Sequence, residues 1–295
     1  MLWAVFTLLG AAGQTARNGL QRHLTPQLGA LGATLVRFLF GLPFALVFLL
    51  LAWGLTGAAM PRLSWDFLLW LLLGALTQIA ATALMLATME RRSFVVTTAY
   101  LKAEPVLVAL MGLVLLGDPL TPAMAAAILA ATLGVVLVSV RPGVLERGGW
   151  TPALLGLSSA ALFAASAIGY RGAILALDRA DYLLPASVTL VAGLLLQTVL
   201  LLAWFGWRRR ATLSAVLAHW RPSLAAGFAG AAASQMWFLA FALASAASVR
   251  TLALVEVLFA QIVSRYVFRQ AMTAREAAGI ALLLAGAVLI VWAEA

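Results

Sequence analysis

The sequence predicts an all-α membrane protein with ten transmembrane helices, arranged as two inverted five-helix repeats. Composition is the first observation behind this prediction. Of the 295 residues, 64% are hydrophobic and 10% are charged, and the mean hydropathy is +1.06, which the water-exposed surface of a soluble domain does not tolerate. The apolar runs are continuous rather than alternating and are long enough to cross a bilayer, which favours helices over barrel strands.

The expected spans follow one another with short connections and leave no room for a soluble domain. The first span is preceded by no basic segment and followed by no small-residue cleavage site, so we interpret it as a span and not as a signal peptide. The expected spans are 2–20, 30–53, 65–88, 94–116, 122–140, 152–170, 184–206, 223–244, 250–268 and 276–293.

An internal repeat is the second observation. The segment that starts at Ala103 aligns with the segment that starts at Val255 at a constant offset of 152 residues. The alternative is a chance alignment of Leu- and Ala-rich sequence, but the matching polar positions argue against it. Five spans per half place the second repeat in the opposite orientation, so we expect repeats over 1–145 and 146–295. The key matched pairs are Glu104 with Glu256, Thr121 with Thr273, Gly134 with Gly286, and Thr77-Gln78 with Ser234-Gln235.

The charge distribution predicts the orientation. The net charge of +9 comes from 18 Arg and one Lys against ten acids, and in a membrane protein it reports topology rather than nucleic-acid binding, which we exclude. One set of connections holds eleven arginines and the other set, with Arg62, Arg171, Arg179 and Arg250, holds four. By the positive-inside rule the richer set is cytoplasmic, so both termini are expected outside the cytoplasm.

Several kinds of site are missing from the sequence. The chain has no cysteine, and its two histidines, His23 and His219, fall in expected connections without a carboxylate at ligand spacing. There is no glycine-rich phosphate loop, no HExxH motif and no visible Ser/His/Asp arrangement. We therefore expect no metal, no cofactor and no enzymatic activity.

Charged residues inside the expected spans are the strongest functional candidates, because each is costly unless it faces a partner or a wet cavity. Glu104 and Glu256 lie at equivalent positions and are candidates for proton titration or cation binding; the alternative is a structural pair with Arg or Lys. Lys102 is a candidate for a substrate carboxylate or phosphate, with ion pairing as its alternative. On a regular helix it is rotated by about 200° from Glu104, but Pro105 disturbs that turn.

Amide, aromatic and cationic residues complete the candidate set. Span 1 carries a polar face of Gln14, Arg17, Asn18 and Gln21 at helical spacing. Together, mixed amide and aromatic side chains suit a small amphipathic solute, although each one alone is more often a packing contact. The remaining candidates for substrate binding or coupling are Gln78, Tyr100, Tyr170, Gln235 and Trp237, and Gln261 belongs to the same group.

The motif "AYLKAEPVLVALMGLVLLGDPLT" followed by "AAILAATLGVVLVS" resembles the EamA repeat of the drug/metabolite transporter superfamily. The second half repeats the pattern but departs from it, since Val257 and Leu258 follow Glu256 and Arg269-Gln270 replace the Gly-acid pair of the turn. The resemblance covers essentially the whole chain. The residues of the first half that match the motif are Glu104, Pro105, Gly117, Asp118, Leu120, Thr121 and Gly134.

The resemblance implies a multi-pass secondary transporter of the bacterial inner membrane, with a central cavity between the halves and alternating access. Members are often exporters of amino acids, including aromatic ones, and related metabolites, so we expect export of such compounds with protons as the candidate coupling ion. A passive facilitator of the same solutes and a lipid-acting membrane enzyme remain as alternatives. The expected partners are the small-molecule substrate and membrane lipids. Many members have cytoplasmic termini, and here we give the arginine distribution more weight.

Overall fold

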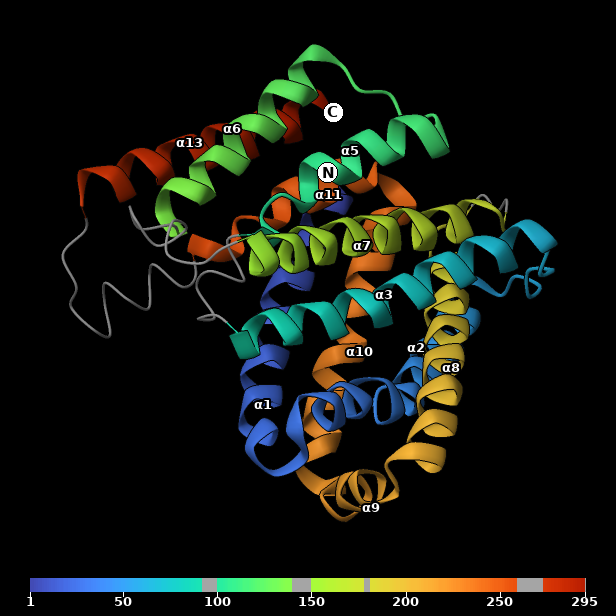
Figure 1. Ribbon diagram of the computed structural model, residues 1–295. Helices are drawn as coiled ribbons and strands as arrows, with labels where there is room; N and C mark the ends of the chain where they lie inside the picture. The colour runs from blue at the N-terminus through green and yellow to red at the C-terminus, as the bar shows by residue number, and fades with distance from the viewer. Residues whose placement is uncertain (92–99, 140–149, 178–180, 259–272, 295) are drawn as a thin grey trace. The chain divides into compact units, whose positions relative to one another are not determined.

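The computed structural model describes the 295-residue chain except residues 92–99, 140–149, 178–180, 259–272 and 295 (Figure 1). In the described part the chain forms helices joined by turns, and it contains no strand there. The helices are α1 Leu2–Leu39, α2 Leu42–Thr56, α3 Trp65–Arg91, α5 Glu104–Met111, the π-helical η1 Gly112–Leu116, α6 Pro122–Ser139, α7 Trp150–Leu175, α8 Leu183–Arg208, α9 Arg210–Ala218, α10 Trp220–Leu243, α11 Ala246–Ala253 and α13 Ala274–Ala293.

Seven helices of the described part are long and apolar enough to cross a membrane, which confirms a multi-pass, all-α membrane protein. They correspond to seven of the ten expected spans. Of the other three, 2–20 is helical within α1, whereas 94–116 and 250–268 lie partly outside the described residues. The count of ten spans therefore stays a prediction. The seven candidates are Leu31–Thr56, Trp65–Met85, Pro122–Ser139, Leu154–Leu175, Leu183–Arg208, Trp220–Leu243 and Ala274–Ala293.

The expected connection between the first two spans is wrong in its extent. Helix α1 continues through His23, which we expected in a loop, and the helical geometry is interrupted only at Gly29 (φ 68°, ψ 167°). Leu24 and Leu28, one helical turn apart, are 1% and 5% exposed and pack into the core with Val216 of α9. Burial of this apolar stripe keeps the polar segment, including Pro26, helical up to Gly29. Gly29 has no Cβ and can therefore take the positive φ.

The connection after the seventh expected span also contains structure. Helix α9 occupies Arg210–Ala218 between the end of α8 and the start of α10 (Figure 1). Val216 is its buried contact to the core, and its amphipathic composition explains why a hydropathy pattern tuned to spans does not detect it.

The structure divides into two compact units, and each takes segments from both expected repeats. Unit 1 comprises Met1–Leu8, Ala80–Ile168 and Ala244–Ala295, and unit 2 comprises Leu9–Ile79 and Gly169–Leu243. Helices α3 and α7 contribute to both units. The units are groupings in space, so the division into sequence repeats at 145/146 stays a prediction.

Glycines bring α6 and α13 of unit 1 together. A Cβ on Gly134 would lie 2.5 Å from the Leu283 nitrogen, and a Cβ on Gly286 would lie 2.6 Å from the Ala131 nitrogen. Gly279, earlier on α13, approaches Val138, later on α6. Ala131, Gly134 and Val138 follow one another along α6, and their partners Gly286, Leu283 and Gly279 run in the reverse order along α13. The two helices therefore pack antiparallel at backbone contact distance.

Unit 2 is built on α2, α8 and α10, which pack against one another. Glycine again lets two segments pack closely, here α10 and the end of α1. A Cβ on Gly227 of α10 would lie 2.5 Å from the Phe40 carbonyl. Phe38 and Phe205 are almost fully buried in this unit. The tight packing fixes the positions of the polar side chains described below.

Candidate functional site

Both interior acids stand directly after a break in a helix. Lys102 and Ala103 form a turn before Glu104 begins α5, and Leu254 and Val255 form a turn before the helical residue Glu256. In each turn a backbone N–H bonds the carbonyl three residues back: Ala103 to Tyr100 at 3.2 Å and Val255 to Leu252 at 3.1 Å. Within the described residues, the expected spans 94–116 and 250–268 are thus interrupted at these turns. Such breaks supply the polar backbone groups of transporter binding sites.

The cause of the break differs between the two segments. Pro105 lies in the first turn of α5, where its fixed φ suits the start of a helix and its missing N–H leaves the preceding turn without a bond. The equivalent residue of the second segment is Val257, which removes no donor. The first break is explained by the local sequence, and the second has no such local cause.

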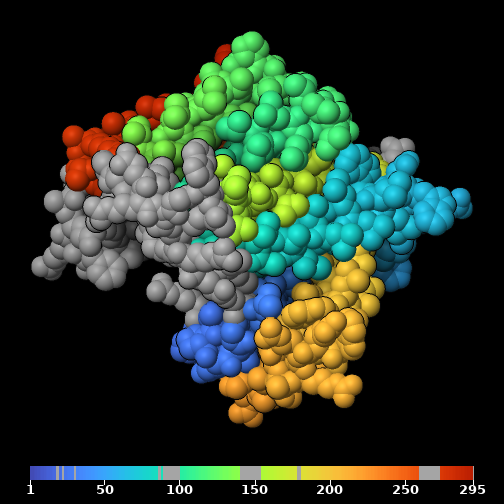
Figure 2. Space-filling view, viewed as in Figure 1, coloured from blue at the N-terminus to red at the C-terminus, as the bar shows by residue number. Residues whose placement is uncertain are grey.

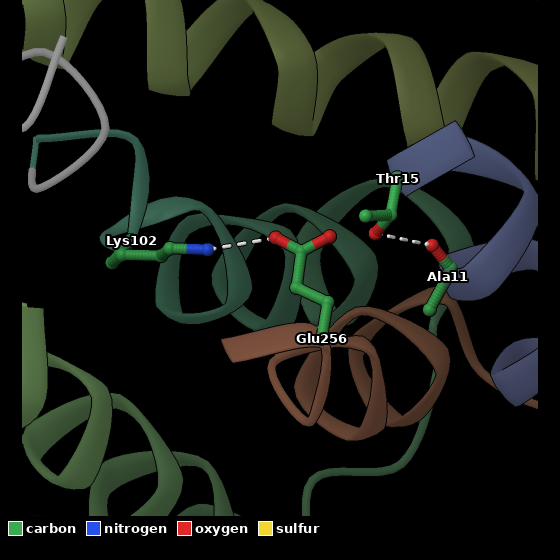
Figure 3. Close-up of polar contacts among 4 residues, drawn as sticks. All are labelled: Ala11, Thr15, Lys102 and Glu256. Atoms are coloured by element: carbon green, nitrogen blue, oxygen red, sulfur yellow. Dashed lines mark hydrogen bonds and ion pairs between the residues drawn. The ribbon is translucent and has the colours of Figure 1, made fainter. Parts of the chain in front are cut away.

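Two ion pairs connect the interrupted helices in a crossed arrangement. Lys102 Nζ lies 2.8 Å from Glu256 Oε1 (Figure 3), and Arg250 Nε lies 3.1 Å from Glu104 Oε1. The side chains of Lys102 and Glu256 are 13% and 24% exposed, and those of Arg250 and Glu104 are both 17% exposed. Each acid pairs with a base from the other half of the chain, which gives two positive and two negative charges in one cluster.

Lys102 and Glu104 take different ion-pair partners but belong to the same cluster. The rotation of about 200° expected for a regular helix does not apply to them, because Lys102 lies in the turn before α5. Charges of this kind are tolerated at membrane depth when they are paired, because pairing offsets part of their desolvation cost. Either carboxylate can accept a proton or a cation only after its present ion pair opens.

Arg250 is a cluster residue that the sequence analysis misplaced. We counted it among the arginines of a connection, but it lies on α11, which begins at the N-cap Ser245 and buries most of its residues. Arg171, counted in the same way, lies within α7, and its guanidinium donates to the Phe241 carbonyl. Its place less than two helical turns before Glu256 could have singled out Arg250, although its pairing with Glu104 depends on the packing of α5 against α11.

The C-terminal end of α13 holds the beginning of α11. Glu294 Oε1 accepts hydrogen bonds from the hydroxyls of Ser245 at 2.8 Å and Ser248 at 2.6 Å. The contact secures the helix that carries Arg250.

Tyr100, the remaining candidate of unit 1, packs against α7. A Cβ on Gly156 would lie 2.6 Å from the Tyr100 ring, so only glycine fits there. The tyrosine lies two residues before Lys102 and its ring is partly exposed. The structure therefore places Tyr100, Lys102, Glu104 and Glu256 in unit 1, the last three in one charge cluster.

An uncharged polar network occupies the interior of unit 2. Gln78 Oε1 accepts hydrogen bonds from Tyr170 OH at 3.3 Å and from Gln197 Nε2 at 2.8 Å. Gln197 Nε2 also lies 3.3 Å from the Ala75 carbonyl. Tyr170 and Gln197 are 2% and 1% exposed. The structure brings the predicted Gln78 and Tyr170 together and adds Gln197, a single amide in the apolar run of α8 that sequence reasoning passed over.

The other predicted residues of α10 lie close to this network. Gln235 Nε2 donates to the Ser187 hydroxyl at 3.0 Å, and both residues are buried. The ring of Phe238 lies 4.7 Å from that of Tyr170, centroid to centroid. Trp237, 4% exposed, packs against α1, where a Cβ on Gly10 would lie 3.1 Å from its indole. These aromatic contacts make Trp237 and Tyr170 packing residues as well as site candidates.

Two arginines of α1 converge on one position of α10. A Cβ on Gly230 would lie 3.3 Å from Arg37 Cγ and 3.4 Å from Arg17 Cδ. Arg17 is 7% exposed, and Gln14, one turn earlier, is partly exposed. Unit 2 therefore gathers Gln14, Arg17, Gln78, Tyr170, Gln235 and Trp237, whereas Gln261 lies outside the described residues.

Among the described residues, no group of three or more His, Asp or Glu side chains could hold a metal ion. His219, between α9 and α10, has its Nδ1 2.9 Å from the Ala215 carbonyl. The arrangement instead provides ion pairs and amide groups, which can bind an organic solute or a proton.

Comparison with known proteins identifies a family and a shared fold. Residues 1–140 match the model of the EamA-like transporter family, which confirms the resemblance predicted from the sequence motifs. No curated protein matches the chain. A solved structure described only as "Crystal structure of protein" is similar at 17% identity and a TM-score of 0.69, over 99% of this chain and 96% of that one. At this identity the likeness shows a shared fold.

Proposed function

We propose that this chain, whose residues 1–140 belong to the EamA-like transporter family, is a ten-span, inverted-repeat secondary transporter of small organic metabolites. It moves them by alternating access, and the two repeats cover 1–145 and 146–295. The observation that carries the proposal is the crossed pairing of Glu104 and Glu256 at the two helix breaks. Paired interior charges beside broken helices are typical of carriers, in which they bind substrates or coupling ions.

The geometry of unit 1 supports the repeat. At the offset of 152 residues the two breaks coincide, and so do the helix caps: Thr121 Oγ1 accepts from the Met124 N–H and Thr273 Oγ1 from the Glu276 N–H, each at 3.2 Å. The glycine contacts of α6 and α13 are reciprocal at the same offset. Equivalent helices that pack antiparallel cross a membrane in opposite directions, as an inverted repeat requires.

Within this proposal the charge cluster links solute and proton binding. Glu104 and Glu256 are the candidates for protonation or cation binding. Lys102 is the candidate for an anionic group of the solute, because it belongs to the first repeat alone: Leu254 stands at its equivalent position. The amide and aromatic residues of unit 2, together with Arg17 and Gln14, are the candidates for contacts with an amphipathic solute.

Export of amino acids, the bacterial inner membrane and extracytoplasmic termini complete the proposal. The first two rest on the family resemblance. The orientation rests on the arginine distribution over the expected connections, eleven in one set against four in the other.

Transport by the purified protein in proteoliposomes tests the proposal. We expect counterflow of labelled amino acids, and faster uptake or release when a pH gradient is imposed. Glu104→Gln should abolish the response to the gradient. A transport rate that is changed neither by the gradient nor by Glu104→Gln would instead indicate a passive facilitator. A lipid-modifying activity that disappears on substitution of His23 or His219 would favour the enzyme alternative over any carrier.

A further inference from the structure

A surface of arginine and tryptophan side chains surrounds helix α9 of unit 2, and we call it the Arg–Trp surface. Its arginines are exposed, and Trp207 and Trp220 are 72% and 48% exposed. Figure 2 shows the segment that carries it, coloured yellow to orange, at the surface of the molecule. The surface consists of Trp207, Arg208, Arg209, Arg210, Trp220 and Arg221.

The positive charge of this surface is not balanced by acids of its own segment. The sequence from Tyr182 to Val255 contains no Asp or Glu. The side chains of α8, α9 and α10 that are ionised at neutral pH are therefore all arginines. Four guanidinium groups within 14 residues generate a strong local positive potential. Such a potential attracts a multivalent or clustered anion.

The arginines are partly held in place by their neighbours. The Arg208 guanidinium lies 3.9 Å from the centre of the Trp207 ring, and that of Arg221 lies 5.4 Å from the centre of the Trp220 ring. Arg210 Nε donates to the Gly206 carbonyl at 2.9 Å. Cation–π stacking, and the hydrogen bond of Arg210 at the C-terminal end of α8, already restrict these side chains. Binding therefore removes less conformational freedom from them.

The position of the surface along the spans identifies its environment. The candidate spans Leu183–Arg208 and Trp220–Leu243 end and begin there, and α9 joins them with Val216 buried in the core. Ends of membrane spans lie at the boundary between hydrocarbon and water, where tryptophan is enriched and phospholipid headgroups are the abundant ligands.

We propose that the Arg–Trp surface binds the headgroups of anionic phospholipids. The guanidinium groups take the phosphate oxygens in charge-assisted, bidentate hydrogen bonds, and the two indoles lie among the glycerol and upper acyl groups. Such binding anchors α9 at the membrane surface. It does not depend on what the protein transports, and it is independent of the proposed carrier function.

Lipid titration of the purified full-length chain in neutral detergent tests this proposal. The probe is dioleoylphosphatidylglycerol, with dioleoylphosphatidylcholine and inorganic phosphate as separate arms, and the readouts are the thermal midpoint and the number of lipids retained in native mass spectrometry. We expect the anionic lipid to raise the midpoint by several degrees more than either control. This difference should shrink at high salt, because surface charge is screened.

Substitutions locate the effect. Each arginine near an anionic lipid surface contributes about fivefold in binding, so Arg208→Gln should weaken the apparent Kd for phosphatidylglycerol about fivefold. The combined Arg208→Gln, Arg209→Gln and Arg221→Gln variant should weaken it about a hundredfold. Arg62→Gln, which removes an exposed arginine from another connection of the same unit, is the matched control and should leave the Kd unchanged. Arg208→Lys keeps the charge and should lie between wild type and Arg208→Gln.

Four outcomes would overturn the proposal. They are wild-type affinity in the triple variant, an equal loss in Arg62→Gln, equal stabilisation by phosphatidylcholine, and equal stabilisation by inorganic phosphate. The thermal midpoint without lipid checks that each variant is folded. If the triple variant does not fold, the comparison of Arg208→Gln with Arg62→Gln decides the question alone.

Discussion

The two compact units handle interior polarity in opposite ways. Unit 1 contains both interior acids, and each is paired with a base across the interrupted helices. Unit 2 contains amide and phenol groups that bond one another, and its described acids lie at helix starts: Asp66 in the first turn of α3, and Asp181, which accepts from the Leu184 N–H. Unit 1 therefore pairs opposite interior charges, whereas unit 2 combines neutral hydrogen bonds with the buried cation Arg17.

This difference teaches which unit is suited to change. Ion pairs whose side chains are 13–24% exposed can exchange a partner for a proton or a solute charge, because each side chain keeps part of its surface accessible. A buried amide network that opens leaves donors and acceptors unsatisfied in a dry interior, which is more costly for each group. The comparison favours rearrangement of polar contacts in unit 1 and a fixed framework in unit 2. The predictions below test it, from the largest expected effect to the smallest.

Substitution of the glycines between α6 and α13 should have the largest effect. Gly134→Leu or Gly286→Leu would force a side chain against backbone atoms 2.5–2.6 Å from the Cβ position. Backbone cannot move away as a side-chain end can, so we expect each change to cost at least about 3 kcal/mol of unfolding free energy. Thermal unfolding in detergent measures this.

A matched control separates crowding from the loss of glycine. Gly54→Leu on α2 meets no atom within 4 Å and should be neutral or slightly stabilising, since glycine disfavours a helix. If Gly134→Leu and Gly54→Leu had the same midpoint, the antiparallel contact would not be a main support of unit 1.

The ion pairs should show a specific coupling pattern. A double-mutant cycle of Lys102→Met and Glu256→Gln should give a coupling energy of about 2 kcal/mol, since removal of one partner leaves the other charge without its counter-ion. The same cycle on Lys102→Met and Glu104→Gln should give a clearly smaller value. Denaturant unfolding in mixed micelles provides the energies. Equal couplings in the two cycles would mean that the charges act as an unspecific cluster and not as crossed pairs.

The amide network of unit 2 should be sensitive at its centre. Gln78→Leu removes the acceptor that Tyr170 and Gln197 share, and we expect a loss of about 1–3 kcal/mol because two buried donors each lose one hydrogen bond. Tyr170→Phe removes a single donor and should cost about 1 kcal/mol. A larger cost for Tyr170→Phe than for Gln78→Leu would show that Gln78 is not the centre of the network. Thermal midpoints compare the two.

The sequence predicts features that depend on local chemistry. The apolar runs predict all seven spans of the described part, and the motif positions predict the equivalence of Glu104 with Glu256 and of Thr121 with Thr273. These follow from hydropathy and from the residue types that cap helices, which act over a few residues.

The sequence does not predict partners that meet through the fold. Arg250 belongs with Glu104 only because α5 and α11 pack together, and Gln197 belongs with Gln78 only because α8 reaches α3. The continuation of α1 past His23 likewise depends on burial of Leu24 and Leu28 against α9. Tertiary contacts decide these three features. A single sequence does not show which residues far apart in the chain come into contact.

The smallest effect should come from the two equivalent helix caps, and it compares the halves of the chain directly. Thr273 and Glu276 form a full capping box at the start of α13, whereas Met124 stands at the equivalent place on α6 and supplies no side-chain acceptor. Thr273→Ala should therefore cost about 1–2 kcal/mol and Thr121→Ala about 0.5–1 kcal/mol, while Ser at either position should retain most of the stability. Unfolding of the four variants under one condition measures the difference. Equal losses at the two sites would mean that the hydrogen bond from the Thr273 hydroxyl to Glu276 adds nothing, and that the two halves are more alike at these caps than their sequences indicate.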